Sequence, residues 1–172
     1  MRIFFLGYMA SGKSTIGKIV AKKYNLSFID LDNYIENREQ KTVSEIFQTK
    51  GEIYFRKKEN EYLKELIKTE ENFVLSLGGG TPCYGNNMSL IGKSKNTISF
   101  YLKASIGTIT DRLKNEKEQR PLVANLKDED FNEFVAKHLF ERSYFYNQAT
   151  HNISIDTKKT DEICNEIYSL LT

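Results

Sequence analysis

Short apolar runs alternate along the chain with longer segments in which apolar residues recur at helical spacing. The apolar runs predict strands, and the longer segments predict helices. The predicted strands cover residues 2–6, 27–29, 73–77, 97–102 and 152–155. The predicted helices cover residues 13–24, 52–68, 105–115, 129–146 and 160–171. Strands that alternate with helices favour an α/β fold, with three α/β/α layers around a central five-stranded parallel sheet.

Local signals add detail to this helical pattern. Thr42 and Glu45 have the spacing of a capping box, which predicts that a short helix begins at Thr42. Gly51 predicts the end of that helix, and the charged helix at 52–68 follows directly. The helix at 13–24 has one apolar face. That face comprises Ile16, Ile19 and Val20.

Length and charge predict one soluble domain covering residues 1–172. The chain has 25 Lys and Arg against 23 Asp and Glu, so its formal net charge is +2. This near balance argues against nucleic acid or a membrane as a partner. No apolar run approaches the roughly 18 residues of a membrane-spanning helix, and the two cysteines, Cys83 and Cys164, suggest no disulfide framework. We therefore expect a cytoplasmic monomer.

The strongest chemical signal follows the first predicted strand. Residues 7–14 read GYMASGKS, which fits the phosphate-binding pattern G-x-x-x-x-G-K-[ST]. Backbone N–H groups of such a loop bind phosphate oxygens, and the positive end of the following helix dipole adds to the attraction. Lys13 is expected to reach the β- and γ-phosphates, and the Ser14 hydroxyl to bind Mg²⁺. The candidate ATP-binding residues of this loop are Ala10, Ser11, Gly12, Lys13, Ser14 and Thr15.

A magnesium ion held by Ser14 needs a carboxylate partner, commonly at the end of another strand. The third predicted strand runs into Gly78 and the fourth ends in Lys103, so neither supplies an acid. Only the second strand does, through Asp30 and Asp32. Because side chains two apart in an extended chain point to the same side, both could face the site. The alternative is that these residues begin a helix, with Asp32 or Asn33 as its N-cap.

Further features suggest a site for a small anionic acceptor. Gly78, Gly79 and Gly80 end the third strand, where bare backbone allows a ligand to approach closely. Arg56 has Glu59 one turn later, a spacing that suits orientation of its guanidinium. Arg142 lies in a late helix, and Arg120 lies in a polar loop that suits a lid. A GTPase is not expected, because the nearest segment to an Asn-Lys-x-Asp run, residues 125–128, has the order wrong.

Together these elements resemble the shikimate kinase family, and the resemblance covers essentially the whole chain. The matching segments are 7–14, 30–32, 55–56, 78–80, 120–122 and 141–142. The resemblance implies a P-loop NTPase fold of the nucleoside monophosphate kinase type, with an acceptor-binding segment at about 33–61 and a lid at about 114–127. It also implies transfer of the γ-phosphoryl group of ATP to the 3-hydroxyl of shikimate, with Mg²⁺ as cofactor, on the route to chorismate and aromatic amino acids.

On the nucleotide side, the resemblance implies that Asp30 contacts Mg²⁺ through water and that Arg112 lies against the adenine. Arg120 would move in with the lid to meet the transferring phosphoryl group. Phosphoryl transfer passes through a loose transition state, so charge neutralisation matters more than a strong base. Lys13, Mg²⁺ and Arg120 would supply that neutralisation.

On the acceptor side, the resemblance implies that Asp32 holds the acceptor hydroxyls, while Arg56 and Arg142 clamp the shikimate carboxylate. A planar guanidinium suits that task because it can bind a carboxylate through two hydrogen bonds. Backbone groups of Gly78, Gly79 and Gly80 would bind the ring hydroxyls. An aspartate is a poor base toward an alcohol, so Asp32 would orient the hydroxyl and accept its proton late.

The chain departs from the family pattern at a few positions. Ala10 occupies a position where the family most often has glycine, a change that we expect the loop to absorb. Residues 81–83, Thr-Pro-Cys, follow the glycines where smaller residues are usual, and the adenine-side loop near Asp156 and Thr157 is weakly marked. Two other functions are weighed: a kinase of the same architecture with gluconate or a nucleotide as acceptor, and a nucleotide-dependent switch without catalysis.

Overall fold

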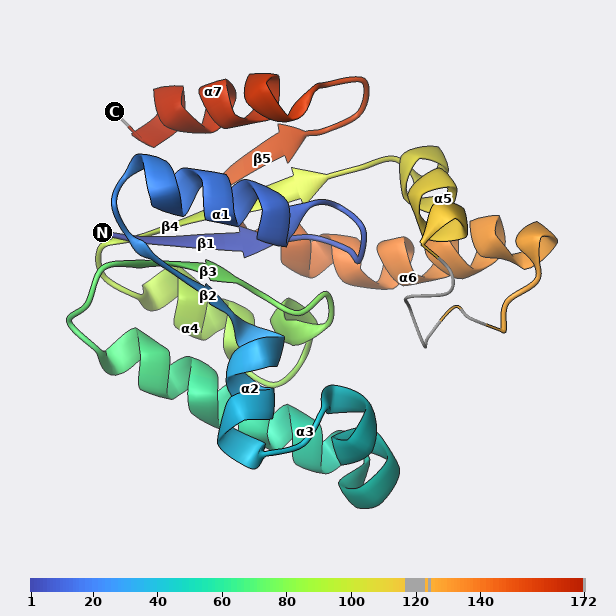
Figure 1. The fold of residues 1–172 in the computed structure, drawn as a ribbon, viewed down its shortest axis with the longest axis horizontal. Helices are drawn as coiled ribbons and strands as arrows, with labels where there is room; N and C mark the ends of the chain where they lie inside the picture. The colour runs from blue at the N-terminus through green and yellow to red at the C-terminus, as the bar shows by residue number, and fades with distance from the viewer. Residues whose placement is uncertain (117–122, 124, 172) are drawn as a thin grey trace.

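The computed structural model describes residues 1–116, 123 and 125–171. Its sheet has five parallel strands in the order β2-β3-β1-β4-β5 (Figure 1). This confirms the five-stranded parallel sheet predicted from the sequence. The strands are β1 (Arg2–Leu6), β2 (Ser27–Asp30), β3 (Phe73–Ser76), β4 (Thr97–Lys103) and β5 (His151–Ser154).

Helices cover both faces of the sheet, which gives the predicted three layers. Helices α1 and α7 lie on one face, and α3, α4 and α6 lie on the other (Figure 1). The α-helices are α1 (Lys13–Lys23), α2 (Leu31–Glu39), α3 (Val43–Lys68), α4 (Asn87–Lys93), α5 (Ile106–Asn115), α6 (Phe131–Tyr146) and α7 (Thr160–Leu171). Two short 3₁₀ turns are η1 (Thr81–Cys83) and η3 (Asp128–Asp130).

The core is built around β1, whose residues Ile3 to Leu6 are fully buried. Aromatic rings pack across the strands: Phe5 and Phe100 stack at 5.7 Å between ring centroids. Burial of a side chain of this size contributes about 1.5–3 kcal/mol. On α1, Ile16 and Val20 are buried, whereas Ile19 is 36% exposed.

The second strand ends differently from the prediction. The chain turns into α2 immediately after Asp30, which is the N-cap of that helix. Its side chain accepts hydrogen bonds from the backbone N–H groups of Asp32, at 3.2 Å, and Asn33, at 3.4 Å. The prediction of Asp32 or Asn33 as the cap is therefore wrong, and so is the extended geometry assumed for the aspartate pair.

The capping box at the start of α3 is confirmed. Thr42 accepts a hydrogen bond from the backbone N–H of Glu45, and the Glu45 carboxylate accepts from the backbone N–H of Thr42. The helix continues to Lys68 but kinks at Gly51, whose φ of 82° and ψ of 170° are not helical. The predicted boundary at Gly51 is therefore a kink between two helical segments.

No helix in the described part of the chain is both long and apolar enough to cross a membrane.

We predict that Gly51→Ala destabilises the protein by about 1–3 kcal/mol, because this backbone conformation is essentially restricted to glycine. A steric clash does not cause the destabilisation, since a Cβ at Gly51 would have no neighbour within 4 Å. Chemical denaturation of both proteins measures the difference. The matched control is Gly92→Ala in α4, which also meets nothing within 4 Å and should stabilise the helix by up to about 1 kcal/mol. Equal effects of the two substitutions would contradict the conformational explanation.

Candidate active site

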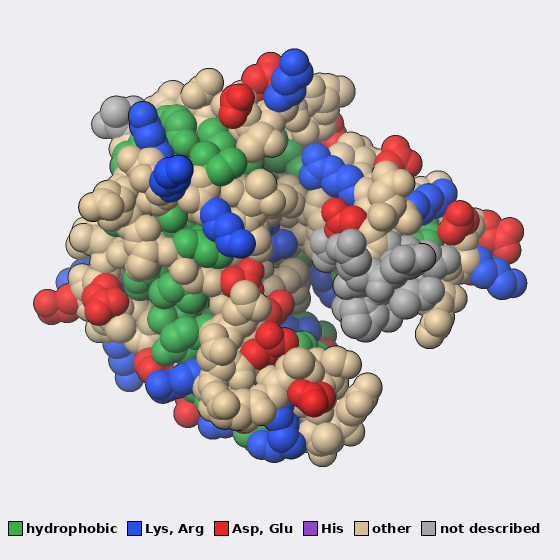
Figure 2. Space-filling model, viewed as in Figure 1, with side chains coloured by type: hydrophobic (Ala, Val, Ile, Leu, Met, Phe, Trp, Pro, Cys, Tyr) green, Lys and Arg blue, Asp and Glu red, His purple; other side chains and the backbone are tan. Residues whose placement is uncertain are grey.

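A cleft of about 640 Å³ lies at the carboxyl edge of the sheet. Figure 2 shows the surface hollowed between the α2–α3 segment and α5, with acidic and basic side chains on the walls. Parallel α/β sheets bind ligands at this edge, because all strands end there. The phosphate loop, both aspartates after β2, the first two glycines after β3 and Arg112 line the cleft.

The phosphate loop begins at Gly7 and leads into α1. Gly7 has a φ of 144°, and a Cβ at this position would lie 2.9 Å from the Leu102 carbonyl oxygen, so no larger residue fits. Gly12, with a φ of 93°, is the N-cap of α1 and makes no side-chain cap. The N–H groups of the first helical turn therefore point toward the cleft without a side-chain acceptor, an arrangement suited to phosphate.

Lys13 is held inside the loop. Its side chain is buried, and Nζ donates a hydrogen bond to the Tyr8 carbonyl oxygen at 2.9 Å. Ala10 has a left-handed φ of 61°, and Arg112 donates to its carbonyl oxygen at 3.0 Å. The loop thus holds alanine at this position in a strained backbone conformation. The Ala10 carbonyl is hydrogen-bonded to a side chain of α5.

Ser14 and Asp30 lie together, as the metal prediction requires. The Ser14 hydroxyl donates to Asp30 Oδ2 at 2.8 Å and lies 3.3 Å from the Ser76 hydroxyl. Asp30 also caps α2 through its other oxygen, so capping and metal binding are compatible roles of one carboxylate. Within residues 1–116, 123 and 125–171, no cluster of three His, Cys, Asp or Glu could enclose a metal. A hydroxyl and a carboxylate suit Mg²⁺, which keeps waters and binds substrate phosphates.

Asp32 lies in the first turn of α2 and faces the cleft. Burial raises the pKa of its carboxyl to about 6, with further contributions from the nearby charges of Asp30 and Glu59. Lys13 and Arg56 act in the opposite direction and lower this pKa. A carboxyl with a pKa near 6 is a better proton acceptor than an ordinary aspartate.

The three predicted acceptor side chains converge on the glycine triplet, each at a different glycine. A Cβ at Gly78 would lie 2.9 Å from Asp32 Oδ1. At Gly79 the nearest atom would be Arg142 Nη1 at 3.4 Å, and at Gly80 it would be Arg56 Nη2 at 2.7 Å. The carboxylate and both guanidinium groups thus approach one stretch of bare backbone beside the phosphate loop.

Arg56 is oriented as its spacing from Glu59 predicted. Its Nη1 donates to both carboxylate oxygens of Glu59, at 3.2 and 3.0 Å. Glu59 is fully buried. Burial raises the pKa of the Glu59 carboxyl, and Arg56 together with a hydrogen bond from Thr81 opposes that rise. Paired in this way, the carboxylate is an anchor for the guanidinium rather than a free charge.

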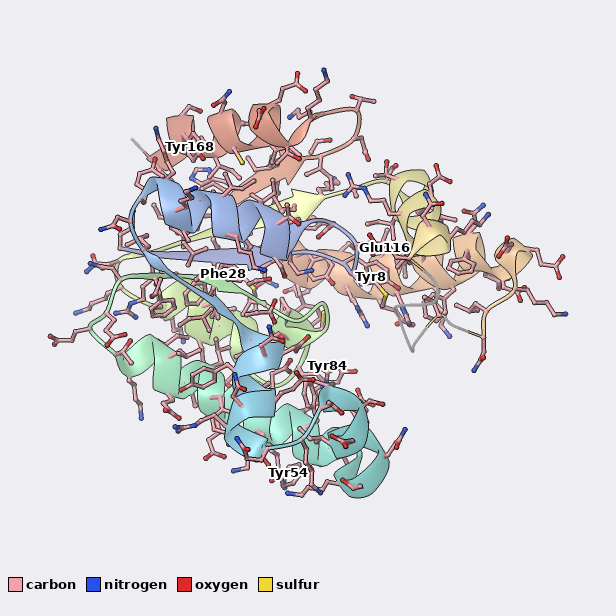
Figure 3. The ribbon with its side chains drawn as sticks, in the orientation of Figure 1. Tyr8, Phe28, Tyr54, Tyr84, Glu116 and Tyr168 are labelled. Atoms are coloured by element: carbon pink, nitrogen blue, oxygen red, sulfur yellow. The ribbon has the colours of Figure 1, made fainter. Side chains whose placement is uncertain are left out.

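Aromatic residues that the sequence reasoning missed support Arg142. Its Cζ lies 5.3 Å from the ring centroid of Tyr8, and Tyr8 also hydrogen-bonds His138 Nδ1 at 2.8 Å (Figure 3). Tyr146 donates to the carbonyl oxygen of Gly79. His138 and Tyr146 lie four residues before and after Arg142 on α6. That i±4 spacing is the sequence signal that could have identified them, because such residues share a helix face.

Asp156, in the predicted adenine-side loop, has partners within the protein. It accepts hydrogen bonds from the Ser105 backbone N–H at 3.0 Å and the Thr108 hydroxyl at 2.6 Å, and thereby fixes the start of α5. Lys158, Thr160 and Ile163, by contrast, line the cleft. Arg120, the predicted lid arginine, lies outside the described residues.

This fold and its phosphate loop define the protein as a P-loop phosphotransferase. A family model for shikimate kinase matches residues 9–172. The chain belongs to the shikimate kinase family.

Relatives and solved structures agree with this assignment. The chain is 50% identical over 170 residues to a shikimate kinase of Flavobacterium psychrophilum, with 99% of this chain and 98% of the relative covered. It resembles the crystal structure of shikimate kinase from Bacteroides thetaiotaomicron, with a TM-score of 0.91, 36% identity and coverage of 99% and 98%. The Acinetobacter baumannii enzyme, solved in complex with shikimate, is similar with a TM-score of 0.85, 27% identity and coverage of 99% and 92%.

The raised pKa of Asp32 predicts that Asp32→Asn stabilises the ligand-free protein above pH 6. Native Asp32 holds its proton up to about pH 6, whereas an unfolded aspartate loses it near pH 4. Stability due to this group therefore falls as the pH rises from about 4 to 6. At pH 7 to 8 the variant should be more stable by up to about 3 kcal/mol, and the difference should vanish below pH 4. Urea denaturation across this range measures it.

The matched control for this prediction is Asp111→Asn, which changes an exposed aspartate on α5. It should leave stability unchanged across the same range. A gain for Asp32→Asn that persists undiminished at pH 4 would contradict the electrostatic origin.

Proposed function

We propose that this protein transfers the γ-phosphoryl group of ATP to the 3-hydroxyl of shikimate, giving shikimate 3-phosphate and ADP. The observation that carries this proposal is the convergence of Asp32, Arg56 and Arg142 on the glycine triplet beside the phosphate loop. Two cations and a carboxylate match an acceptor that bears a carboxylate and hydroxyls. The product belongs to the route to chorismate and aromatic amino acids.

In this proposal the phosphate loop binds and orients ATP. Backbone N–H groups of residues 10–15 and the Lys13 amine hold the phosphates, and Arg112 lies against the adenine. Arg112 is suited to that position because it already joins α5 to the loop through the Ala10 carbonyl. The lid arginine Arg120 approaches the transferring group, a role that rests on the family resemblance alone.

Asp32 orients the acceptor hydroxyl and accepts its proton as the new bond to phosphorus forms. Its raised pKa supports this role, because an aspartate with a pKa of about 6 retains a proton more readily than an ordinary one. The guanidinium groups of Arg56 and Arg142 hold the shikimate carboxylate, while Gly78, Gly79 and Gly80 offer backbone groups to the ring hydroxyls. Positioning of this kind supplies much of the rate acceleration in phosphoryl transfer.

Ser14, with Asp30 through water, would hold Mg²⁺. The ion would neutralise charge on the β- and γ-phosphates. The paired hydroxyl and carboxylate support this assignment, since hard oxygen ligands suit that ion. Asp30 keeps its cap on α2 in the same arrangement, so metal binding needs no rearrangement of the helix start.

The remaining features of the proposal concern organisation. One kinase domain covers residues 1–172, with an acceptor-binding segment at about 33–61 and a lid at about 114–127. The protein acts as a cytoplasmic monomer on small molecules, without nucleic acid or membrane partners. Balanced charge supports the absence of such partners.

A coupled assay with ATP, Mg²⁺ and shikimate tests the proposal, and phosphorus NMR identifies the product. Formation of shikimate 3-phosphate supports it. Turnover with gluconate or a nucleotide but not with shikimate would replace it by another acceptor kinase. ATP binding without transfer to any of these acceptors would favour a nucleotide-dependent switch.

Asp32→Asn should abolish phosphoryl transfer while leaving ATP binding largely intact, because the amide cannot accept the hydroxyl proton. Steady-state turnover and calorimetric titration with ATP measure the two effects separately. A variant with normal turnover would remove Asp32 from the chemistry.

Arg142→Ala should raise the KM for shikimate by about 10- to 100-fold, the effect of losing a charge-assisted hydrogen bond. The KM for ATP should change far less. Arg142→Lys should recover only part of the loss, because a lysine cannot bind a carboxylate through two parallel hydrogen bonds. The control is Lys137→Ala, which removes an exposed cation from the same helix. Equal rises in both KM values would place Arg142 away from the carboxylate.

A further inference from the structure

The segment after the glycine triplet contains a buried hydroxyl that the reaction itself does not use. Thr81 is fully buried, and its Oγ1 donates to Glu59 Oε1 at 2.6 Å. This short hydrogen bond ends on a carboxylate, which makes it stronger than one between neutral groups. Thr81 thus adds a donor to the anchor of Arg56.

Glu59 leaves one nitrogen of the Arg56 guanidinium without a carboxylate partner. Glu59 binds only Nη1 of the guanidinium. Nη2 is the atom that a Cβ at Gly80 would meet first, at 2.7 Å. Among the described residues, no hydrogen bond occupies Nη2. Through Glu59, Thr81 therefore contributes to fixing the guanidinium against Gly80.

Tyr84, three residues later, holds the same guanidinium from another side. The Cζ atom of Arg56 lies 3.9 Å from the centroid of the Tyr84 ring. The Tyr84 hydroxyl donates to Glu52 Oε1 at 2.9 Å, and the same oxygen accepts from Arg56 Nε at 3.4 Å. In Figure 3 Tyr84 lies beside α3, whose part after the Gly51 kink carries Glu52 and Arg56. The ring and the buried hydroxyl together limit how far the guanidinium can turn.

The segment that presents these two side chains is itself fixed. Asn87, fully buried, donates to the Thr81 carbonyl oxygen at 2.8 Å. Asn60 on α3 in turn donates to Asn87 Oδ1 at 2.6 Å. Pro82 also restricts the backbone of the 3₁₀ turn η1. A buried hydrogen-bonded chain of this kind gives a single arrangement rather than several.

We propose that Thr81 and Tyr84 are positioning residues for acceptor recognition. Through Glu59 and through the ring face, they hold the guanidinium of Arg56 in the orientation that binds the acceptor carboxylate. This inference rests on the proposed function, since it assigns a task to the arginine that the proposal places on shikimate. It gives a role to residues 81–84, which include the departure from the family pattern noted in the sequence.

The buried surroundings explain why one hydroxyl matters. Glu59 lies near the carboxylates of Asp32 and Glu52, and Arg56 and Thr81 are the groups that stabilise its charge. Removal of the Thr81 hydroxyl leaves Oε1 with a poorer set of donors at a site that water does not reach. The Glu59–Arg56 pair then loosens, because a buried ion pair depends on satisfaction of its remaining hydrogen-bonding capacity.

The test compares Thr81→Val, which keeps the shape and removes the hydroxyl, with Thr81→Ser, which keeps the hydroxyl. The KM for shikimate should rise about tenfold in Thr81→Val and return close to the wild-type value in Thr81→Ser. The KM for ATP should stay within about twofold in both. Thr110→Val is the matched control, because Thr110 is 2% exposed and its hydroxyl has no partner among the described residues. This control should leave both KM values unchanged.

Tyr84 provides a second and independent set of variants. Tyr84→Leu removes the ring face and should raise the KM for shikimate, whereas Tyr84→Phe keeps the ring and should have the smaller effect. Because Tyr84 is 38% exposed, these variants are expected to fold even if Thr81→Val does not. Thermal melting of every variant separates loss of structure from loss of recognition.

The outcomes separate this inference from the proposed function. Absence of wild-type turnover with shikimate would overturn the proposed function and the inference together. Wild-type turnover with an unchanged KM for shikimate in Thr81→Val, or in Tyr84→Leu if Thr81→Val does not fold, would overturn the inference alone. Equal rises in the KM values for ATP and shikimate, or failure of Thr81→Ser to restore recognition, would also overturn it.

Discussion

Three carboxylates, from Asp30, Asp32 and Glu59, approach one another at a sheet edge where burial reduces screening by water. The site depends on how each negative charge is compensated. The Ser14 hydroxyl and the start of α2 stabilise Asp30, while Arg56 and Thr81 stabilise Glu59. Burial raises the pKa of Asp32, and the nearby charges of Asp30 and Glu59 add to this rise, while Lys13 and Arg56 oppose it. In the proposed reaction this carboxylate is the one that meets the substrate hydroxyl.

The strand order explains how these groups come together. β3 lies between β2 and β1, so the glycine triplet lies between the aspartates that follow β2 and the phosphate loop that follows β1. In the proposed reaction, a nucleotide on the loop and an acceptor on the glycines would thereby be neighbours. The two arginines lie on helices that flank the sheet. Arg56 on α3 approaches Gly80, and Arg142 on α6 approaches Gly79. The kink at Gly51 permits this approach, because it redirects α3 between its capped start and Arg56.

Features that depend on local sequence could be predicted: the strands, the phosphate loop, the capping box and the Arg56–Glu59 pair all rest on short spacings. Helix α2 entered the prediction only as the alternative in which Asp32 or Asn33 begins a helix, because only Leu31 and Ile35 of its residues are buried and its apolar period is weak. Because α2 was not the favoured interpretation, Asp32 was assigned to extended chain instead of to the first turn of a helix. The contacts of Thr81 with Glu59 and of Tyr146 with Gly79 join residues 22 and 67 positions apart, so no local pattern reveals them.

Ala10 shows how such long-range contacts can stabilise an unfavourable local backbone conformation. A left-handed alanine costs roughly 1–2 kcal/mol relative to a right-handed one, and glycine at this position would avoid most of that cost. The Ala10 carbonyl, however, accepts a hydrogen bond from Arg112 on α5, so the strained residue joins the phosphate loop to that helix. Strain of this kind persists only where surrounding contacts determine the backbone. A nucleotide that contacts both the loop and Arg112 would strengthen the same link, and binding would then couple the loop geometry to the position of α5.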